Sequence, residues 1–287
     1  MDTRRSLRRS GFSLIEVLVV VGIMSMLGAI LLPSLSRARC QAKIARWGVF
    51  THNIRADEGI VALYTFEFDG GSSTRLKNVA VGGTLNSESE SEELDGMLIN
   101  TSLSKVGRCG KDAAYFNGAN AYANCQQSAA LDVGTQMSVL AWVYPLGPTG
   151  RDGQEGIINN HDSNADTGFT FYLDDMRLAM SFGDGGGGWP YSRIPKSQAT
   201  VPLNRWSHVA VVRDGTTMTF YLNGKQDSVH AVGPNKMAPG QNDVWIGGDT
   251  NVPGHAWFSG YIDEIAVYNR ALDKQAINHF VKMGQME

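Results

Sequence analysis

Residues 205–224 read RWSHVAVVRDGTTMTFYLNG and contain two short runs that alternate between two kinds of side chain. Every second position is Trp206, His208, Ala210 and Val212 in the first run, and Met218, Phe220 and Leu222 in the second. A period of two residues places such side chains on one face of a β-strand. The stretch therefore predicts two half-buried strands, over 205–213 and 218–222.

The same kind of sequence pattern continues over residues 57–287, where short apolar and aromatic runs are separated by Gly, Asn and Asp. Most of the 33 glycines lie here, which indicates many turns. Further strands are predicted over 61–68, 113–116, 121–124, 137–144, 156–159, 167–173, 177–182, 243–246 and 258–267. We expect one domain, an all-β sandwich that closes with a short helix over 274–283.

This part resembles the laminin-G-like, concanavalin A-like jelly-roll domains. The resemblance depends on seven blocks in order: VALYTF at 61–66, DAAYFNG at 112–118, MSVLAWV at 137–143, NRWSHVA at 204–210, FYLNG at 220–224, IGG at 246–248 and FSGYIDE at 258–264. It implies a mainly β jelly roll behind a long N-terminal helix. Such domains bind glycans, bind proteins or only build a surface, so the resemblance supplies no ligand.

Residues 8–35 read RRSGFSLIEVLVVVGIMSMLGAILLPSL, a basic start and an apolar run with one acid, Glu16, near its beginning. A carboxylate inside a membrane-spanning stretch costs about 2.5 to 3.5 kcal/mol, so it needs a partner and indicates a function. Ordinary signal peptides and plain anchors do not require such a group.

The order Gly11, Phe12, Ser13, Leu14, Ile15 and Glu16 resembles the start of type IV pilins and type II secretion pseudopilins. The resemblance implies that a prepilin peptidase removes a leader, 1–11, by cutting between Gly11 and Phe12, and methylates the new amine. Residues 12–55 then form the membrane and filament-core helix. In the filament, Glu16 would pair with the Phe12 amine of a neighbouring subunit and set the axial register.

Three other interpretations compete for this segment. A plain anchor has only residues 17–32 before Pro33, a short span for a bilayer. A secretory signal would need small residues at its cleavage site, where 34–40 read SLSRARC. Residues 3–8, TRRSLR, partly match a twin-arginine export signal.

Pro33 and Gly28 also predict a kink or a locally melted stretch within the helix.

Charge is divided unevenly along the chain. Residues 1–55 carry a net charge of +7 and the remainder −10, which gives the total of −3. Four arginines before the apolar run mark the cytoplasmic side, so the acidic bulk is expected across the inner membrane, in the periplasm and then on a filament or the cell surface. An acidic domain of this kind is not expected to bind nucleic acid.

The chain has three cysteines. Cys109 and Cys125 flank a predicted hairpin that turns at 117–118, and the expected compartment is oxidising, so they are predicted to form a disulfide. The alternative is two buried thiols. Cys40 is expected to be a small apolar residue of the helix bundle.

No catalytic constellation is apparent, and no enzymatic activity is expected. Jelly-roll glycosidases of the laminarinase type carry Glu-x-Asp-x-Glu on one strand, whereas residues 67–71 read EFDGG and lack the third acid. His208 alternates with apolar residues, which favours a structural role over that of a base.

Two kinds of ligand site are weaker candidates. Calcium, the one cofactor considered, would use the oxygen-rich loops with Asp162, Asp166, Asp243 and Asp249, which also suit ordinary turns. A glycan or an extracellular protein would stack on Trp189 and Tyr191 in the glycine-rich segment, or on Trp257.

Together these patterns predict a non-enzymatic pilin-like or pseudopilin-like subunit that displays a lectin-like domain for adhesion or recognition. Its expected partners are other copies or related pilin-like subunits, the prepilin peptidase, the inner membrane before assembly, and a glycan or extracellular protein. The alternative is an inner-membrane-anchored carbohydrate- or protein-binding module that does not polymerise.

Overall fold

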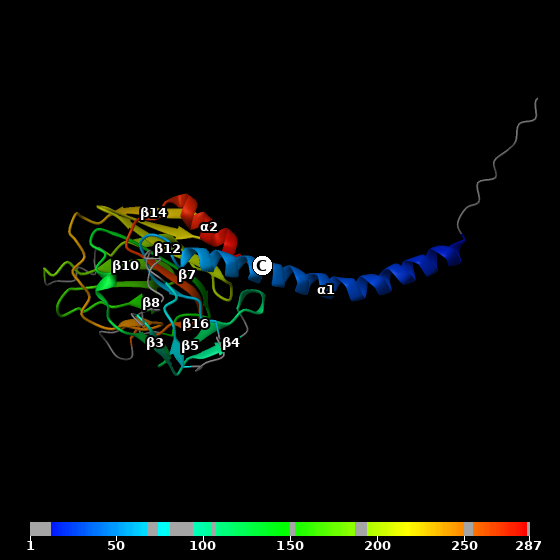
Figure 1. Cartoon of the computed structure of the whole chain (residues 1–287), viewed down its shortest axis with the longest axis horizontal. Coiled ribbons are helices and arrows are strands. Elements are labelled where there is room, and N and C mark those ends of the chain that lie inside the picture. Colours follow the sequence, from blue (N-terminus) through cyan, green and yellow to red (C-terminus); the bar gives the residue numbers. More distant parts are fainter. Residues whose placement is uncertain are drawn as a thin grey trace, which may run out of the picture.

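The computed structural model has one long helix that projects from two packed β-sheets (Figure 1). It describes residues 13–67, 74–80, 94–104, 107–149, 153–186, 194–249 and 255–285. This arrangement confirms the predicted fold class, a β-sandwich behind an N-terminal helix.

Helix α1 spans Leu14–Ile54, 41 residues, and is about 60 Å long at 1.5 Å per residue. It continues through Pro33 without a break, so the locally melted stretch is not observed. The part that precedes its last turns is exposed, and the helix is long and apolar enough to cross a membrane.

All the described strand pairings are antiparallel. Sheet A contains β14 (Lys225–Ala231), β13 (Thr217–Leu222), β12 (Ser207–Asp214), β7 (Gln136–Pro145), β16 (Ser259–Tyr268), β5 (Ala113–Asn117) and β4 (Ser102–Ser104) in that order, with β1 (Ile60–Tyr64) also paired to β16. Sheet B contains β11 (Lys196–Thr200), β10 (Arg177–Phe182), β9 (Phe169–Asp174), β8 (Gln154–Asn159), β15 (Val244–Ile246), β6 (Tyr122–Cys125), β3 (Gly96–Ile99) and β2 (Arg75–Leu76). Short 3-10 turns, η1 (Arg108–Gly110) and η2 (Ala129–Leu131), and the closing helix α2 (Lys274–Gly284) complete the described elements.

The main core lies between the two sheets. Phe116, Val139 and Phe220 from sheet A meet Phe171 and Ile246 from sheet B, and all are buried. Alternation along each strand explains this packing, because every second side chain points toward the facing sheet.

A second core lies on the outer face of sheet A. The last turns of α1 supply Trp47 and Phe50, α2 supplies Phe280, and they cover Leu140 and Ala210. The Phe50 and Phe280 rings meet edge to face at 5.1 Å. Residues 207–213 of β12 are therefore buried on both faces rather than half-buried, because one face meets sheet B and the two helices cover the other.

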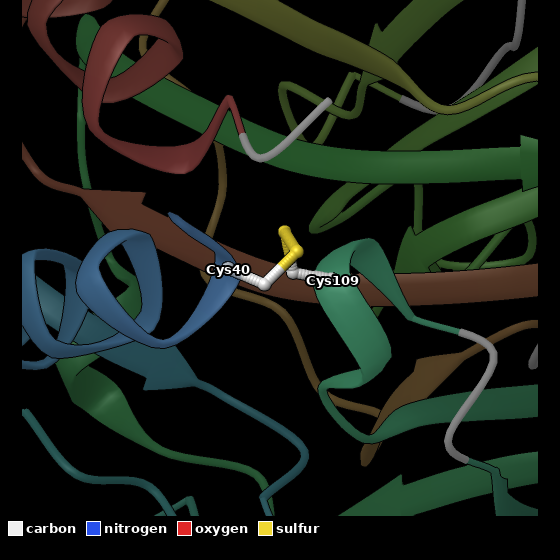
Figure 2. The surroundings of a disulfide bond; sticks show 2 residues. All are labelled: Cys40 and Cys109. Atoms are coloured by element: carbon white, nitrogen blue, oxygen red, sulfur yellow. A yellow bond between two sulfur atoms is a disulfide. The ribbon is translucent and has the colours of Figure 1, made fainter. Parts of the chain in front are cut away.

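The predicted disulfide between Cys109 and Cys125 was wrong: Cys109 is bonded to Cys40 instead, with their Cα atoms 5.3 Å apart. Figure 2 shows the bond joining α1 to η1. The strands on either side of residues 117–118, β5 and β6, do not form a hairpin but belong to different sheets. Cys125 therefore points into the main core, where burial raises the pKa of its thiol to about 12.

Candidate functional site

The start of α1 is a capping box. The Glu16 amide donates to Oγ of Ser13 at 3.3 Å, and the Ser13 amide donates to Oε2 of Glu16 at 2.8 Å. The Glu16 carboxylate thus has a hydrogen-bond partner in its own chain. Because Glu16 is exposed, the carboxylate can also bind a second partner. Gly11 and Phe12 lie outside the described residues.

A buried ion cluster lies where α1 meets the sandwich. Arg108 of η1 pairs with Asp263 at 3.1 Å and with Glu264, and Lys111 pairs with Glu264 and with Glu67, the latter at 2.8 Å. Burial disfavours the charged lysine, but the facing carboxylates Asp263 and Glu264 outweigh it and raise the pKa of Lys111. The two cations of the cluster are therefore charged, whereas burial raises the pKa of Asp263 to about 7.

A β-bulge in β16 makes this cluster possible. Consecutive strand residues normally face opposite sides of a sheet, but the register of β16 on β7 shifts between Asp263 and Ala266. Glu264 adopts a φ of 54°, in the left-handed region. Both carboxylates thus reach Arg108, and their ion pairs offset the cost of this backbone conformation.

Aromatic side chains and a helix end complete the junction. The Arg108 guanidinium lies 4.0 Å from the centre of the Trp142 ring and 6.0 Å from that of Trp47 in α1. Arg108 also donates to the carbonyl of Gly284 at the end of α2. One residue therefore links η1, β16, α2 and α1, directly beside the Cys40–Cys109 bond.

His208 lies near this cluster and is buried. Its ring meets Trp142 edge to face at 5.4 Å, and burial together with the charge of Arg108 lowers its pKa to about 3. The imidazole is therefore neutral and packed, in agreement with a structural role.

The aspartates considered for calcium lie in segments between the named strands and have protein partners. Oδ1 of Asp162 accepts from the backbone of Asn164 and Ala165 at 2.8 and 3.2 Å, as in an Asx turn. Asp166 is buried, with a φ of 53°. Asp243 accepts from Asn124 and Asp249 from Asn159, at 3.3 and 3.2 Å. Among the described residues, no three His, Cys, Asp or Glu side chains gather in a way that could hold a metal ion.

Trp257 belongs to an aromatic cluster on sheet B. Its ring is stacked against that of Trp245 at 6.1 Å, and Tyr122 stacks on Trp245 at 4.2 Å. Trp257 itself is mostly buried, whereas Trp245 and Tyr122 are half-buried. Trp189 and Tyr191, the other aromatic candidates, lie outside the described residues.

Sequence reasoning did not single out Tyr122, Trp245 or Arg108. In β15 the sequence Val-Trp-Ile places the indole on the face opposite two buried aliphatic residues, and that alternation was a usable signal for Trp245. Nothing local marks Arg108, because its partners lie more than 150 positions along the chain.

Comparisons with known proteins agree with this geometry. Residues 117–278 match the concanavalin A-like lectin/glucanases superfamily, and residues 6–32 match the prokaryotic N-terminal methylation motif. No curated protein matches the chain.

Several solved structures share the sandwich. Domain 4 of AbnA, a GH43 extracellular arabinanase from Geobacillus stearothermophilus in complex with arabinotriose, has a TM-score of 0.55 at 18% identity, covering 80% of this chain and 100% of that one. The binding domain of Paraclostridial Mosquitocidal Protein 1 has a TM-score of 0.55 at 14% identity, covering 78% and 52%. The binding domain of Botulinum neurotoxin DC, in complex with rat synaptotagmin II, has a TM-score of 0.54 at 11% identity, covering 81% and 52%.

At these identities the likeness shows the fold, and the chain spans about half the length of the two toxin chains. The family match covers more than half of the chain. The chain therefore belongs to the concanavalin A-like lectin/glucanases superfamily and carries a prokaryotic N-terminal methylation motif ahead of its sandwich.

Proposed function

We propose that this chain is a pilin-like or pseudopilin-like structural subunit of a type IV pilus or type II secretion filament, and that it displays its lectin-like sandwich for adhesion or recognition. The observation that carries the proposal is the methylation motif at the start of an exposed apolar helix that is clamped to a sandwich at its far end. Before assembly, the helix would anchor the chain in the inner membrane with the sandwich in the periplasm.

The position of the clamp supports display. Helix α1 touches the sandwich on the outer face of sheet A, and the disulfide lies where the helix leaves the domain. With α1 packed in a filament core, sheet B would face away from the filament axis. Its outer face would then be open to partners outside the cell.

A non-enzymatic role is part of the proposal. A pocket of about 420 Å³ lies between α1 and the sandwich, with Trp47, His52, Arg55, Glu67 and Lys111 in its lining. Glu67 is the one carboxylate among its lining residues, and it is paired with Lys111. Glycoside hydrolysis needs two carboxylates, so we expect no release of reducing ends from polysaccharides.

The mass of the mature N-terminus tests the processing step. We expect a chain that begins at Phe12 and carries one added methyl group on its amine. A chain that retains its arginine-bearing start and stays in the membrane fraction would instead support the alternative, an anchored binding module that does not polymerise.

Substitution of Glu16 tests assembly. Glu16→Ala should lower the amount of subunit in sheared filaments at least about tenfold, because even about 1.4 kcal/mol lost per contact changes an equilibrium constant tenfold. Ser13→Ala is the matched control, since it removes the hydroxyl of the capping box and keeps the carboxylate. Equal incorporation of the wild-type and Glu16→Ala chains, at equal membrane levels, would refute the proposed pairing of Glu16 with the Phe12 amine of a neighbouring subunit.

A further inference from the structure

The outer face of sheet B carries a continuous row of side chains across six strands. Cross-strand register aligns Met97 with Asn124, Asn124 with Trp245, Trp245 with Asn159, Asn159 with Thr170, and Thr170 with Ser181. Directly opposed residues in antiparallel strands share a face, so the row forms one surface. In the described part of the chain, the helices cover sheet A and not this face, and within the row Asn159 is itself buried.

An aromatic platform lies at the middle of the row. Tyr122 precedes Asn124 by two residues and so shares its face, and its ring stacks on Trp245 at 4.2 Å. Trp257 supports Trp245 at 6.1 Å with nearly parallel ring planes. The indole of Trp245 is thereby held in one orientation while it remains half-buried rather than covered.

Two amides flank this indole on the neighbouring strands, and each is oriented by a carboxylate. Asn124 donates through Nδ2 to Asp243 at 3.3 Å, and Asn159 donates through Nδ2 to Asp249 at 3.2 Å. Oδ1 of Asn124 is shielded and has no hydrogen-bond partner among the described residues. An acceptor in that state is costly, and a hydroxyl donor that meets it after a small rotation of the amide would remove the cost.

We propose that this row, the sheet B face, binds a neutral saccharide, with the pyranose or furanose ring on Trp245 and its hydroxyl groups on Asn124 and Thr170. The inference rests on the proposed display of the sandwich and names the ligand class and the site. Ring C–H groups pack on aromatic faces, and amides and hydroxyls both donate to and accept from sugar hydroxyls.

Charge and hydrophobicity favour a neutral saccharide over other ligands. The six residues of the row are uncharged, and Arg75, which lies opposite Met97 at the end of the row, is paired with Asp95. The carboxylates beside the two amides, Asp243 and Asp249, would disfavour acidic glycans. Met97, at one end of the row, is 60% exposed and is the row's one strongly exposed large hydrophobic residue. Because the core of a protein interface is mostly apolar, the row suits a saccharide better than a protein partner.

The test is isothermal titration calorimetry on the full chain with arabinotriose, maltotriose and cellotriose as neutral probes and sialyllactose as the acidic probe. The detergent should have a phosphocholine headgroup, because a glucoside headgroup would compete for the site. We expect binding of at least one neutral trisaccharide, unchanged by EDTA, and at least tenfold weaker binding in Trp245→Ala.

Three further variants make the result specific. Trp245→Phe keeps a ring and should bind within about threefold of wild type. Thr170→Val should weaken binding about fivefold, since one lost hydrogen bond of about 1 kcal/mol gives that factor. Tyr261→Ala is the matched control, because it removes a half-buried ring from the outer face of sheet A. If Trp245→Ala does not fold, Thr170→Val carries the test.

Several outcomes would overturn the site. These are the absence of binding by any neutral probe, preference for sialyllactose, loss of binding in EDTA, and equal effects of Trp245→Ala and Tyr261→Ala. Filament incorporation of the same variants separates this proposal from the previous one. Filaments without saccharide binding refute the site alone, and saccharide binding by a chain that never assembles refutes the filament role alone.

Discussion

Arg108 shows how a single side chain holds the molecule together. Its guanidinium is buried between two carboxylates, beside the Trp142 ring and under the last residues of α2. A buried cation is tolerated only when it is compensated in this way, and the same holds for the carboxylates it faces.

We predict that Arg108→Met lowers the free energy of unfolding by about 3 to 5 kcal/mol, because Asp263 and Glu264 lose a buried partner. Guanidinium unfolding followed by tryptophan fluorescence measures the change. Arg75→Met is the control: it also removes an ion pair, to Asp95, but Arg75 is 48% exposed and the expected loss is below about 1 kcal/mol. If the free energy of unfolding falls equally in the two variants, Arg108 does not form the buried, stabilising ion pairs described here.

Glu155 makes stability depend on pH. Its side chain is 0% exposed and accepts from the Ser259 amide at 3.3 Å. Burial raises its pKa to about 7 from 4.5, so the folded chain binds the proton more tightly than the unfolded chain. Stability from this group is present below about pH 4.5 and is lost as pH rises through about 7.

Glu155→Gln, which has no proton to lose, should therefore gain stability relative to wild type as pH rises from about 4.5 to about 7, on the order of 3 kcal/mol, and then level off. Unfolding midpoints measured across this range test it. Glu58→Gln, at an exposed carboxylate, is the reference against which the difference is compared. A difference that shrinks with rising pH would reverse the sign and refute the prediction.

At the scale of elements, the decisive contact is between α1 and the sandwich. Trp47, Phe50 and Ile54 bury themselves against sheet A and α2, and the Cys40–Cys109 bond closes a separation of 69 residues. In the chain-entropy account, a loop of that length is worth about 4 kcal/mol, and measured values range lower. The bond thus fixes the direction in which the helix leaves the domain.

Reductant should lower the unfolding temperature of wild type and of Cys125→Ala alike, and should leave Cys40→Ser unchanged, because its bond is already absent. In oxidising buffer, Cys40→Ser should be less stable than wild type by about 2 to 4 kcal/mol. Sensitivity that is lost in Cys125→Ala and kept in Cys40→Ser would show that Cys109 pairs with Cys125 after all. Thermal unfolding with and without reductant distinguishes the two pairings.

At the scale of the whole molecule, the sandwich has two unlike outer faces. Sheet A is covered by α1 and α2 on one side of the molecule (Figure 1), and the polar and aromatic row lies on the outer face of sheet B. A filament built on α1 would bury the apolar helix and leave the sheet B face in solvent.

Methionine oxidation in intact filaments tests whether α1 is buried and the sheet B face is exposed to solvent. Met97 on sheet B, 60% exposed, should be oxidised by peroxide, whereas Met24 and Met26, exposed in the single chain at 67% and 71%, should be protected by neighbouring helices. Met137 in the core is the internal reference for full protection. Oxidation of Met24 and Met26 at the rate of Met97 would mean that α1 is not in the filament core.

Sequence alone determined the features that depend on local periodicity and on motifs. The apolar run with Glu16 indicated the N-terminal helix and the methylation motif, and alternation with a period of two indicated the sandwich. These signals are readable because helices and strands impose their spacing on neighbouring residues. The polar strands β11 and β14 were missed for the same reason, since their apolar alternation is weak.

Only the tertiary structure decided which distant residues meet. It assigned β5 and β6 to different sheets, so that Cys109 and Cys125 do not meet across a hairpin. It paired Cys109 with Cys40 and left Cys125 in the core. It also brought Arg108 to Asp263 and aligned Asn124, Trp245 and Asn159 in one row. Disulfides, buried ion pairs and cross-strand rows depend on contacts between segments far apart in the chain, and local spacing contains no information about which segments become neighbours.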